Sequence, residues 1–85
     1  MIYLDHLATT PCAPEVVEAM SRCLEESWGN PSSAHAMGWS ARELVEEGRA
    51  ALARLLKVRP QRVTLTSGAT EATHIALTSA VSSIP

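Results

Sequence analysis

The segment Thr64–Ala72 constrains the fold of this chain more than any other, because it predicts a strand, a tight turn and a helix in immediate succession. Residues 62–66 alternate between apolar and polar side chains and include β-branched residues, a pattern that favours a strand. Ser67 and Gly68 follow as turn residues, and a helix is expected to begin at Ala69. A strand needs neighbours to satisfy its backbone groups, so this segment predicts an α/β fold.

The turn after this strand has the composition of a small anion-binding site. The first N–H groups of a helix have no partner within it, and the helix dipole adds partial positive charge at that end. Gly68 would let the backbone approach an anion closely, and the hydroxyls of Ser67 and Thr70 can donate further hydrogen bonds. The same residues also suit an ordinary strand-to-helix turn with Ser67 as its N-cap. Local features alone leave both interpretations open.

Apolar periodicity predicts one helix in the N-terminal part of the chain and another at its C-terminal end. The first begins near Pro14, which suits a first helical turn, and its apolar stripe runs over residues 16–24. Cys23 falls on that stripe and is expected to be a small core residue. The last helix is expected over residues 69–81.

A second, longer helix is expected over residues 41–56. Ser40 and Glu43 have the spacing of a capping box, which would place the helix start at Ala41. Gly48 lies on the apolar stripe of this helix, where it would allow a neighbouring element to approach closely. Residues 59–61 are expected to form a turn after it.

The predicted elements do not make a complete α/β domain. Beside three helices there is one convincing strand at residues 62–66 and a short apolar run at residues 2–4 that could pair as an edge strand. A parallel sheet needs partners on both sides. We therefore expect the front piece of a longer protein, whether a truncated gene product, a split subunit or a fragment.

Composition excludes several functional classes. A formal net charge of −2 leaves no basic face for nucleic acid. The apolar residues occur in short periodic runs, so no membrane span is expected, and the start lacks the features of a secretory signal. These features predict a cytoplasmic location. The two cysteines, Cys12 and Cys23, suit neither a disulfide framework nor a zinc site, and no metal ligands are predicted.

Three segments together carry a family resemblance. Residues 2–11 (Ile-Tyr-Leu-Asp-His-Leu-Ala-Thr-Thr-Pro), 29–35 (Gly-Asn-Pro-Ser-Ser-Ala-His) and 66–72 (Thr-Ser-Gly-Ala-Thr-Glu-Ala) resemble, in order and spacing, the start of the cysteine desulfurases. These are pyridoxal-phosphate enzymes of the class V aminotransferase group. The resemblance implies the N-terminal piece of an aspartate-aminotransferase-like fold. Residues 1–85 would then form one incomplete segment, with an arm, helix and loop over 1–38 and the start of the cofactor-binding domain over 39–85.

The resemblance also implies a cofactor site and a reaction. In the family the turn equivalent to Gly68, Ala69 and Thr70 holds the phosphate of pyridoxal 5′-phosphate, so these three residues are the expected cofactor contacts. The complete enzyme would take sulfur from L-cysteine, release alanine and leave a persulfide for iron–sulfur cluster or thio-cofactor assembly. Its partners would be the rest of the enzyme or a homodimer mate, and a sulfur-acceptor protein. An aminotransferase or selenocysteine lyase of the same group, or a non-enzymatic remnant, is the alternative.

Some residues depart from the family pattern, and others are missing. Relatives often carry asparagines where His6, Leu7, Thr73 and His74 stand, so both histidines are expected to be structural or solvated. His35 matches the family loop and is expected to order it. The Schiff-base lysine and the nucleophilic cysteine of the family lie beyond this region, and Lys57, the single lysine, is expected only to favour a helix C-terminus. No catalytic residue is therefore predicted, and the chain alone should be inactive.

Overall fold

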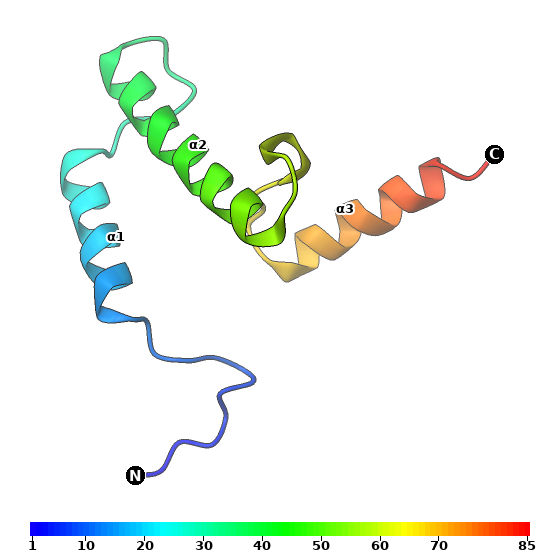
Figure 1. Ribbon diagram of the computed structural model, residues 1–85, viewed down its shortest axis with the longest axis horizontal. Coiled ribbons are helices and arrows are strands. Elements are labelled where there is room, and N and C mark those ends of the chain that lie inside the picture. The colour runs from blue at the N-terminus through cyan, green and yellow to red at the C-terminus, as the bar shows by residue number, and fades with distance from the viewer. The chain divides into compact units, whose positions relative to one another are not determined.

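The computed structural model describes residues 1–85, and its regular elements are all helical (Figure 1). Its elements are α1 (Pro14–Glu26), α2 (Ala36–Leu56), the single 3₁₀ turn η1 (Pro60–Arg62) and α3 (Ala69–Ser82). The chain divides within α2 into two compact units, Met1–Val45 and Glu46–Pro85, which are described separately below. The starts of α1 and α3 agree with the sequence-based prediction.

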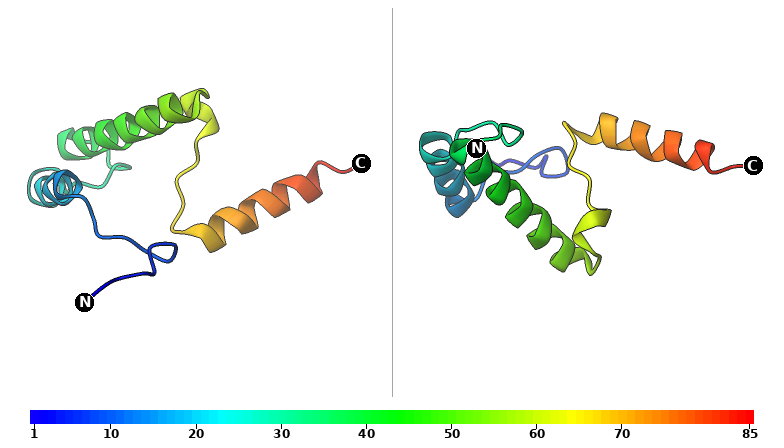
Figure 2. Two further views of the ribbon diagram at one scale, coloured as in Figure 1. Left: turned by 60° about the horizontal axis from the view of Figure 1, so that its bottom comes forward. Right: turned by 90° about the horizontal axis from the view of Figure 1, so that it is seen from above.

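Neither predicted strand forms. Residues 2–4 and 62–66 contain no strand, and Figure 2 shows the connection between η1 and α3 as coil in both views. The backbone at Val63 is nevertheless extended, with φ −102° and ψ 121°. The expectation of one or two short strands is wrong for this chain, because an extended segment becomes a strand only when another one pairs with it.

In the first unit, α1 exposes its apolar stripe. Pro14 occupies the first turn as expected, where its missing N–H leaves no bond unmade. Met20 and Leu24 nevertheless keep 58% and 73% of their surface exposed. Cys23 is also exposed, so its assignment to a core is wrong. The residues have the spacing expected for burial, but in this unit most of their surface stays exposed.

The loop between α1 and α2 packs closely on the first turn of α2. The Ser32 N–H donates to Asn30 Oδ1 at 2.8 Å, and the Ser33 N–H donates to the Asn30 carbonyl at 2.9 Å. A Cβ built on Gly38 would lie 2.2 Å from the Ser33 carbonyl oxygen, which is far inside van der Waals contact. Glycine is therefore required at position 38 for the loop to rest on the helix.

The start of α2 differs from the prediction. The helix begins at Ala36, five residues before Ala41, and the expected capping-box residues Ser40 and Glu43 lie inside it. His35 serves this end instead: its Nδ1 accepts the Gly38 N–H at 3.3 Å and its carbonyl accepts the Trp39 N–H at 2.9 Å. These bonds place His35 at the start of α2, whereas the bonds within the loop are accepted by Asn30. The His35 side chain therefore satisfies one orphan donor of the first turn, the Gly38 N–H, so the helix begins before the cap expected at Ser40.

In the second unit, α2 ends in a Schellman motif. The Val58 N–H donates to the Ala53 carbonyl at 3.0 Å, and the Lys57 N–H donates to the Arg54 carbonyl at 3.3 Å. This geometry places Lys57 in the left-handed region, with φ 56°. Lys57 thus ends the helix through its backbone conformation.

Very little of the chain is buried. Ala41 and Ala53, at 5% and 1% exposure, are the buried hydrophobic residues, one in each unit. A Cβ built on Gly48 would meet no atom within 4 Å, so the close approach expected there does not occur. None of the three α-helices combines the length and apolarity needed to cross a bilayer. The apolar faces of the helices are therefore present without the partners that would bury them.

Candidate phosphate-binding turn

The candidate site is the turn that leads from η1 into α3, wholly within the second unit. Arg49, a half-buried residue of α2, anchors the segment before it by donating from Nη1 to the Val63 carbonyl. The Arg49 Nε also lies 3.2 Å from Glu46 Oε2. A guanidinium with several donors can make both contacts at once. Arg49 therefore ties the chain entering the turn to α2.

Side chains of the turn fix its own backbone. The Thr66 hydroxyl donates to the Gly68 carbonyl at 3.0 Å, and the same carbonyl accepts the Ala72 N–H at 3.1 Å as the first bond of α3. The Ser67 N–H donates to Glu71 Oε2 at 3.2 Å, and the Ser67 hydroxyl donates to the same oxygen. We call the Ser67–Glu71 pair of hydrogen bonds the clasp.

The clasp replaces the N-cap expected at Ser67. Gly68 is the N-cap residue, and no side chain caps the helix. Glu71 is the third helical residue, and its carboxylate reaches back beyond the N-cap to Ser67, one residue further than in a capping box. The interpretation of Ser67 as the N-cap of α3, one of the two left open by the sequence, is therefore wrong, and the Ser67 hydroxyl donates to Glu71.

The start of α3 offers unused donors. No hydrogen bond in the structure engages the N–H groups of Ala69 and Thr70 or the Thr70 hydroxyl. The first N–H groups of a helix lie near its positive dipole end, where they favour an anion. Glu71 adds negative charge at the same end. Ala69 and Thr70, the two residues that follow Gly68, therefore carry three unused donors, two N–H groups and one hydroxyl.

Gly68 leaves the approach to these donors open. Its backbone is extended, with φ 167° and ψ −178°, a conformation available to any residue. A Cβ built there would meet no atom within 4 Å. The glycine is thus required neither by its backbone angles nor by packing within this chain. The space beside it is the space that a closely bound group would need.

Hydrogen bonds from Ser67 perturb the titration of Glu71. The Ser67 hydroxyl, and then the Ser67 N–H, lower the pKa of Glu71 below its ordinary value of 4.5. Both donors favour the ionised carboxylate. The carboxylate is fully exposed and has no ion-pair partner, because the two ion pairs of the chain join Glu18 to Arg22 and Glu46 to Arg49. Glu71 is therefore anionic at neutral pH.

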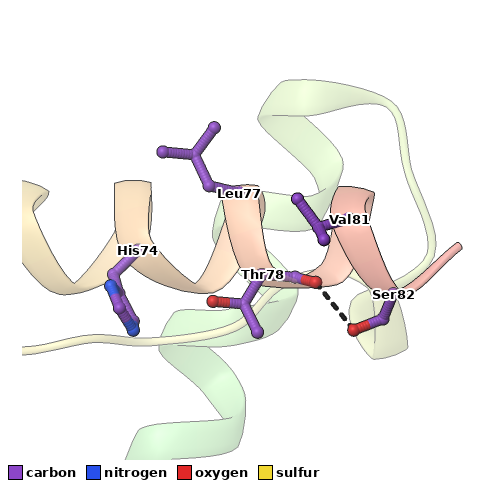
Figure 3. Close-up of a pocket in the computed structure, with 5 residues that line it drawn as sticks. All are labelled: His74, Leu77, Thr78, Val81 and Ser82. Carbon is purple, nitrogen blue, oxygen red and sulfur yellow. Dashed lines mark hydrogen bonds between the residues drawn. The ribbon is translucent and has the colours of Figure 1, made fainter. Parts of the chain in front are cut away.

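The remaining residues considered from sequence lie elsewhere. His6 packs edge-on against Tyr3, with ring centroids 4.7 Å apart, and both cysteines are exposed and free. His74 lies on α3 with Leu77, Thr78 and Val81 along one open face (Figure 3). The Ser82 hydroxyl donates to the Thr78 carbonyl there at 2.8 Å. These contacts are local and bring no second titratable side chain to the turn.

Sequence reasoning missed two contributors to the turn, Glu71 and Arg49. The clasp had a readable signal, because serine and glutamate four residues apart at a helix start resemble a lengthened capping box. Arg49 had none, because its acceptor lies fourteen residues away on another element. No three histidine, cysteine, aspartate or glutamate side chains gather as metal ligands.

The residues present fit a bound phosphate. Two free N–H groups, a free hydroxyl and an uncrowded glycine match the donor chemistry that a phosphate monoester requires. Glu71 opposes such a ligand through its charge, but its carboxylate is held by Ser67 and occupies neither free N–H group. A phosphate placed beside these donors would break none of the hydrogen bonds that hold the turn.

Comparison with known proteins shows the family to which this chain belongs. The family model for aminotransferase class-V matches residues 2–84. The selenocysteine lyase of Xenopus laevis is 48% identical over 80 residues, which are 94% of this chain and 19% of the relative. A cysteine desulfurase of Frankia sp. is 49% identical over 77 residues, covering 91% of this chain and 18% of the relative. Cysteine desulfurase IscS of Pseudomonas entomophila is 47% identical over 79 residues, with coverages of 89% and 20%.

These relatives share most of this chain but are much longer. The chain spans about a fifth of their length. No solved structure matches it significantly. The matched residues include the opening segment, the loop before α2 and the turn at the start of α3. The chain therefore belongs to the class-V aminotransferase family.

Proposed function

We propose that this chain contributes the phosphate-binding turn of a pyridoxal-phosphate enzyme that removes sulfur from L-cysteine. The observation that carries the proposal is the set of unused donors at Ala69 and Thr70, beside an uncrowded Gly68, in a chain 47–49% identical to cysteine desulfurases. Pyridoxal 5′-phosphate supplies an electron sink for the chemistry at the amino acid. Gly68, Ala69 and Thr70 would bind and orient its phosphate.

Selenocysteine is the second candidate substrate. Similarity at 48% identity to the Xenopus laevis selenocysteine lyase favours it as strongly as the desulfurase relatives favour cysteine. Both substrates carry their chalcogen on the β-carbon, whereas the turn is proposed to bind only the cofactor phosphate. The phosphate seat is therefore the same under both proposals.

The chain alone is proposed to lack activity. Its single lysine, Lys57, ends α2 in a left-handed conformation and belongs to the Schellman motif, not to the turn. Residues 1–85 would act as one incomplete segment, completed by the rest of the enzyme or by a homodimer mate. A sulfur-acceptor protein would take the product in the desulfurase case, which ends in a persulfide and alanine.

The phosphate seat can be tested by amide NMR on the ¹⁵N-labelled chain. The probe is 4′-deoxypyridoxine 5′-phosphate, because the aldehyde of the cofactor would react with Lys57 and the amino terminus. The amides of Ala69 and Thr70 should shift on addition of this probe, and the same compound without phosphate should leave them unchanged. Equal shifts with both compounds would contradict a phosphate site.

Variants at the turn sharpen this test. Gly68→Ala should weaken the response, because a methyl group there meets no protein atom and can hinder only the ligand. Gly48→Ala is the matched control, since its new methyl group also meets no atom within 4 Å and lies in α2. A Gly68 variant that binds as well as the Gly48 control would show that the ligand lies elsewhere.

The role of the hydroxyl and the choice of substrate need a complete enzyme. A chimera in which this chain replaces the matching fifth of the Pseudomonas entomophila IscS provides one. Thr70→Val in the chimera should weaken cofactor binding by about ten- to a hundredfold, the effect of losing one charge-assisted hydrogen bond. Lys57→Ala should leave cofactor affinity unchanged. Comparing chalcogen release from L-cysteine and L-selenocysteine would then report whether this segment influences substrate choice.

A further inference from the structure

The clasp is the least expected feature of the turn. A single carboxylate oxygen of Glu71 accepts both Ser67 donors, the backbone N–H at 3.2 Å and the hydroxyl. Glu71 makes no other side-chain hydrogen bond and no ion pair, and the nearest titratable residue along α3 is His74, three positions on. The clasp therefore joins only the two ends of the four-residue step from Ser67 to Glu71.

The clasp has two consequences for a ligand. It occupies the Ser67 donors, so that an anion must use the donors of Ala69 and Thr70. It also holds residue 67 against the first turn of α3, with the extended Gly68 between them. The Thr66 hydroxyl fixes Gly68 as well, by donating to its carbonyl oxygen. A turn held in this way presents its free N–H groups before any ligand arrives, which lowers the cost of ordering them on binding.

We propose that Glu71 is the positioning residue of the phosphate turn, holding Ser67 so that the donors of Ala69 and Thr70 stay free and in place for an anion. This inference rests on the proposed function, because the anion is the cofactor phosphate. Glu71 acts through Ser67 and does not itself contact the ligand. Its negative charge works against the bound phosphate, so position and charge have opposite effects on affinity.

Two substitutions separate the effects of position and charge. Glu71→Gln keeps an oxygen that can accept from Ser67 and removes the charge, so phosphate affinity should be unchanged or up to about fivefold tighter. Glu71→Ala removes the acceptor, and affinity should fall by about two- to tenfold despite the lost repulsion. Ser67→Ala keeps the charge and breaks the hydroxyl half of the clasp, so its affinity should also fall.

The clasp is measured first, without ligand. In the wild-type chain the Ser67 amide proton should move as the pH falls through the pKa of Glu71, which lies below 4.5. In Glu71→Gln the same amide should show no such titration. A wild-type Ser67 amide that does not respond to pH over this range would overturn the clasp and the proposal with it.

Binding is measured second, at pH 7, with 4′-deoxypyridoxine 5′-phosphate and the Ala69 and Thr70 amides as reporters. The proposal is supported if Glu71→Gln binds the probe at least as tightly as the wild type and Glu71→Ala binds it more weakly. Circular dichroism should show equal helix content in the three chains. Equal affinities in all three chains would overturn the positioning role and leave the phosphate site standing. No response in the wild type, with a titrating Ser67 amide, would instead overturn the proposed function and thereby this role for Glu71.

Discussion

Replacing Gly38 and Gly48 by alanine should have opposite effects, although both glycines lie in α2. Alanine in a helix interior is more favourable than glycine by about 0.5–1 kcal/mol, because the glycine backbone loses more freedom on ordering. Gly48→Ala should gain this amount in full, since its new methyl group meets no atom within 4 Å. Gly48 lies in the second unit and Gly38 in the first.

Gly38→Ala gains at most this helix propensity, because position 38 lies in the first turn of α2, and it loses more through packing. Its Cβ would lie 2.2 Å from the Ser33 carbonyl oxygen and 2.8 Å from the Asn30 carbonyl oxygen. Both contacts are with backbone, which cannot rotate away as a side chain would. Forcing a methyl group into such a site costs about 1–3 kcal/mol. The net effect should be a loss of order 1 kcal/mol, concentrated in the loop and the first turn of α2.

Site-resolved amide hydrogen exchange measures both effects, because it reports local opening and does not require a cooperative transition of the whole chain. In Gly38→Ala the Ser33 and Trp39 amides, which donate within the loop and first turn, should exchange about fivefold faster. In Gly48→Ala the amides of the middle of α2 should exchange about two- to fivefold more slowly. If Gly38→Ala instead increases protection as Gly48→Ala does, the loop does not pack on α2 as described.

Four further outcomes follow from other parts of the chain. Lys57→Gly should stabilise the end of α2 by about 1 kcal/mol, because glycine adopts the left-handed conformation without the steric cost that lysine bears, and slower exchange of the Val58 amide would show it. The clasp should be complete above pH 4.5 and lost as the pH falls through the lowered pKa of Glu71. Cα chemical shifts should then show that the start of α3 frays in the wild type. Fraying of equal extent in Glu71→Gln would contradict the assignment. The chain should self-associate, because α3 exposes apolar side chains on nearly opposite sides, Ile75 at 40% and Leu77 at 63% exposure. A monomer in sedimentation experiments with a sharply cooperative denaturant melt would refute this. The chain alone should release no sulfide from L-cysteine with added pyridoxal 5′-phosphate and reductant beyond the free-cofactor control.

Local chemistry explains where prediction from sequence succeeded. Pro14 and the step from Gly68 to Ala69 mark the starts of α1 and α3 correctly, because a proline or a turn residue biases its own backbone whatever surrounds it. The end of α2 at Leu56 was also predicted. Within the site, the cluster Gly68, Ala69 and Thr70 could be singled out from the sequence, since free N–H groups at a helix start follow from the helix itself.

Contacts between distant residues explain where prediction failed. The helix α2 begins at Ala36 and not at Ala41, because His35 accepts the Gly38 N–H and the Asn30–Ser33 loop packs on the first turn. The capping pattern at Ser40 does not indicate either contact. Arg49 reaches Val63 from another element. The predicted strands are absent and the apolar stripe of α1 is uncovered because strand pairing and burial both need a second surface. The existence of three helices, their apolar faces and the turn with free donors can thus be predicted from residues, because each depends on neighbours a few positions away. The coverage of those faces, the start of α2 and the bonds that hold the turn depend on groups brought together in space, so they emerge only from the folded chain.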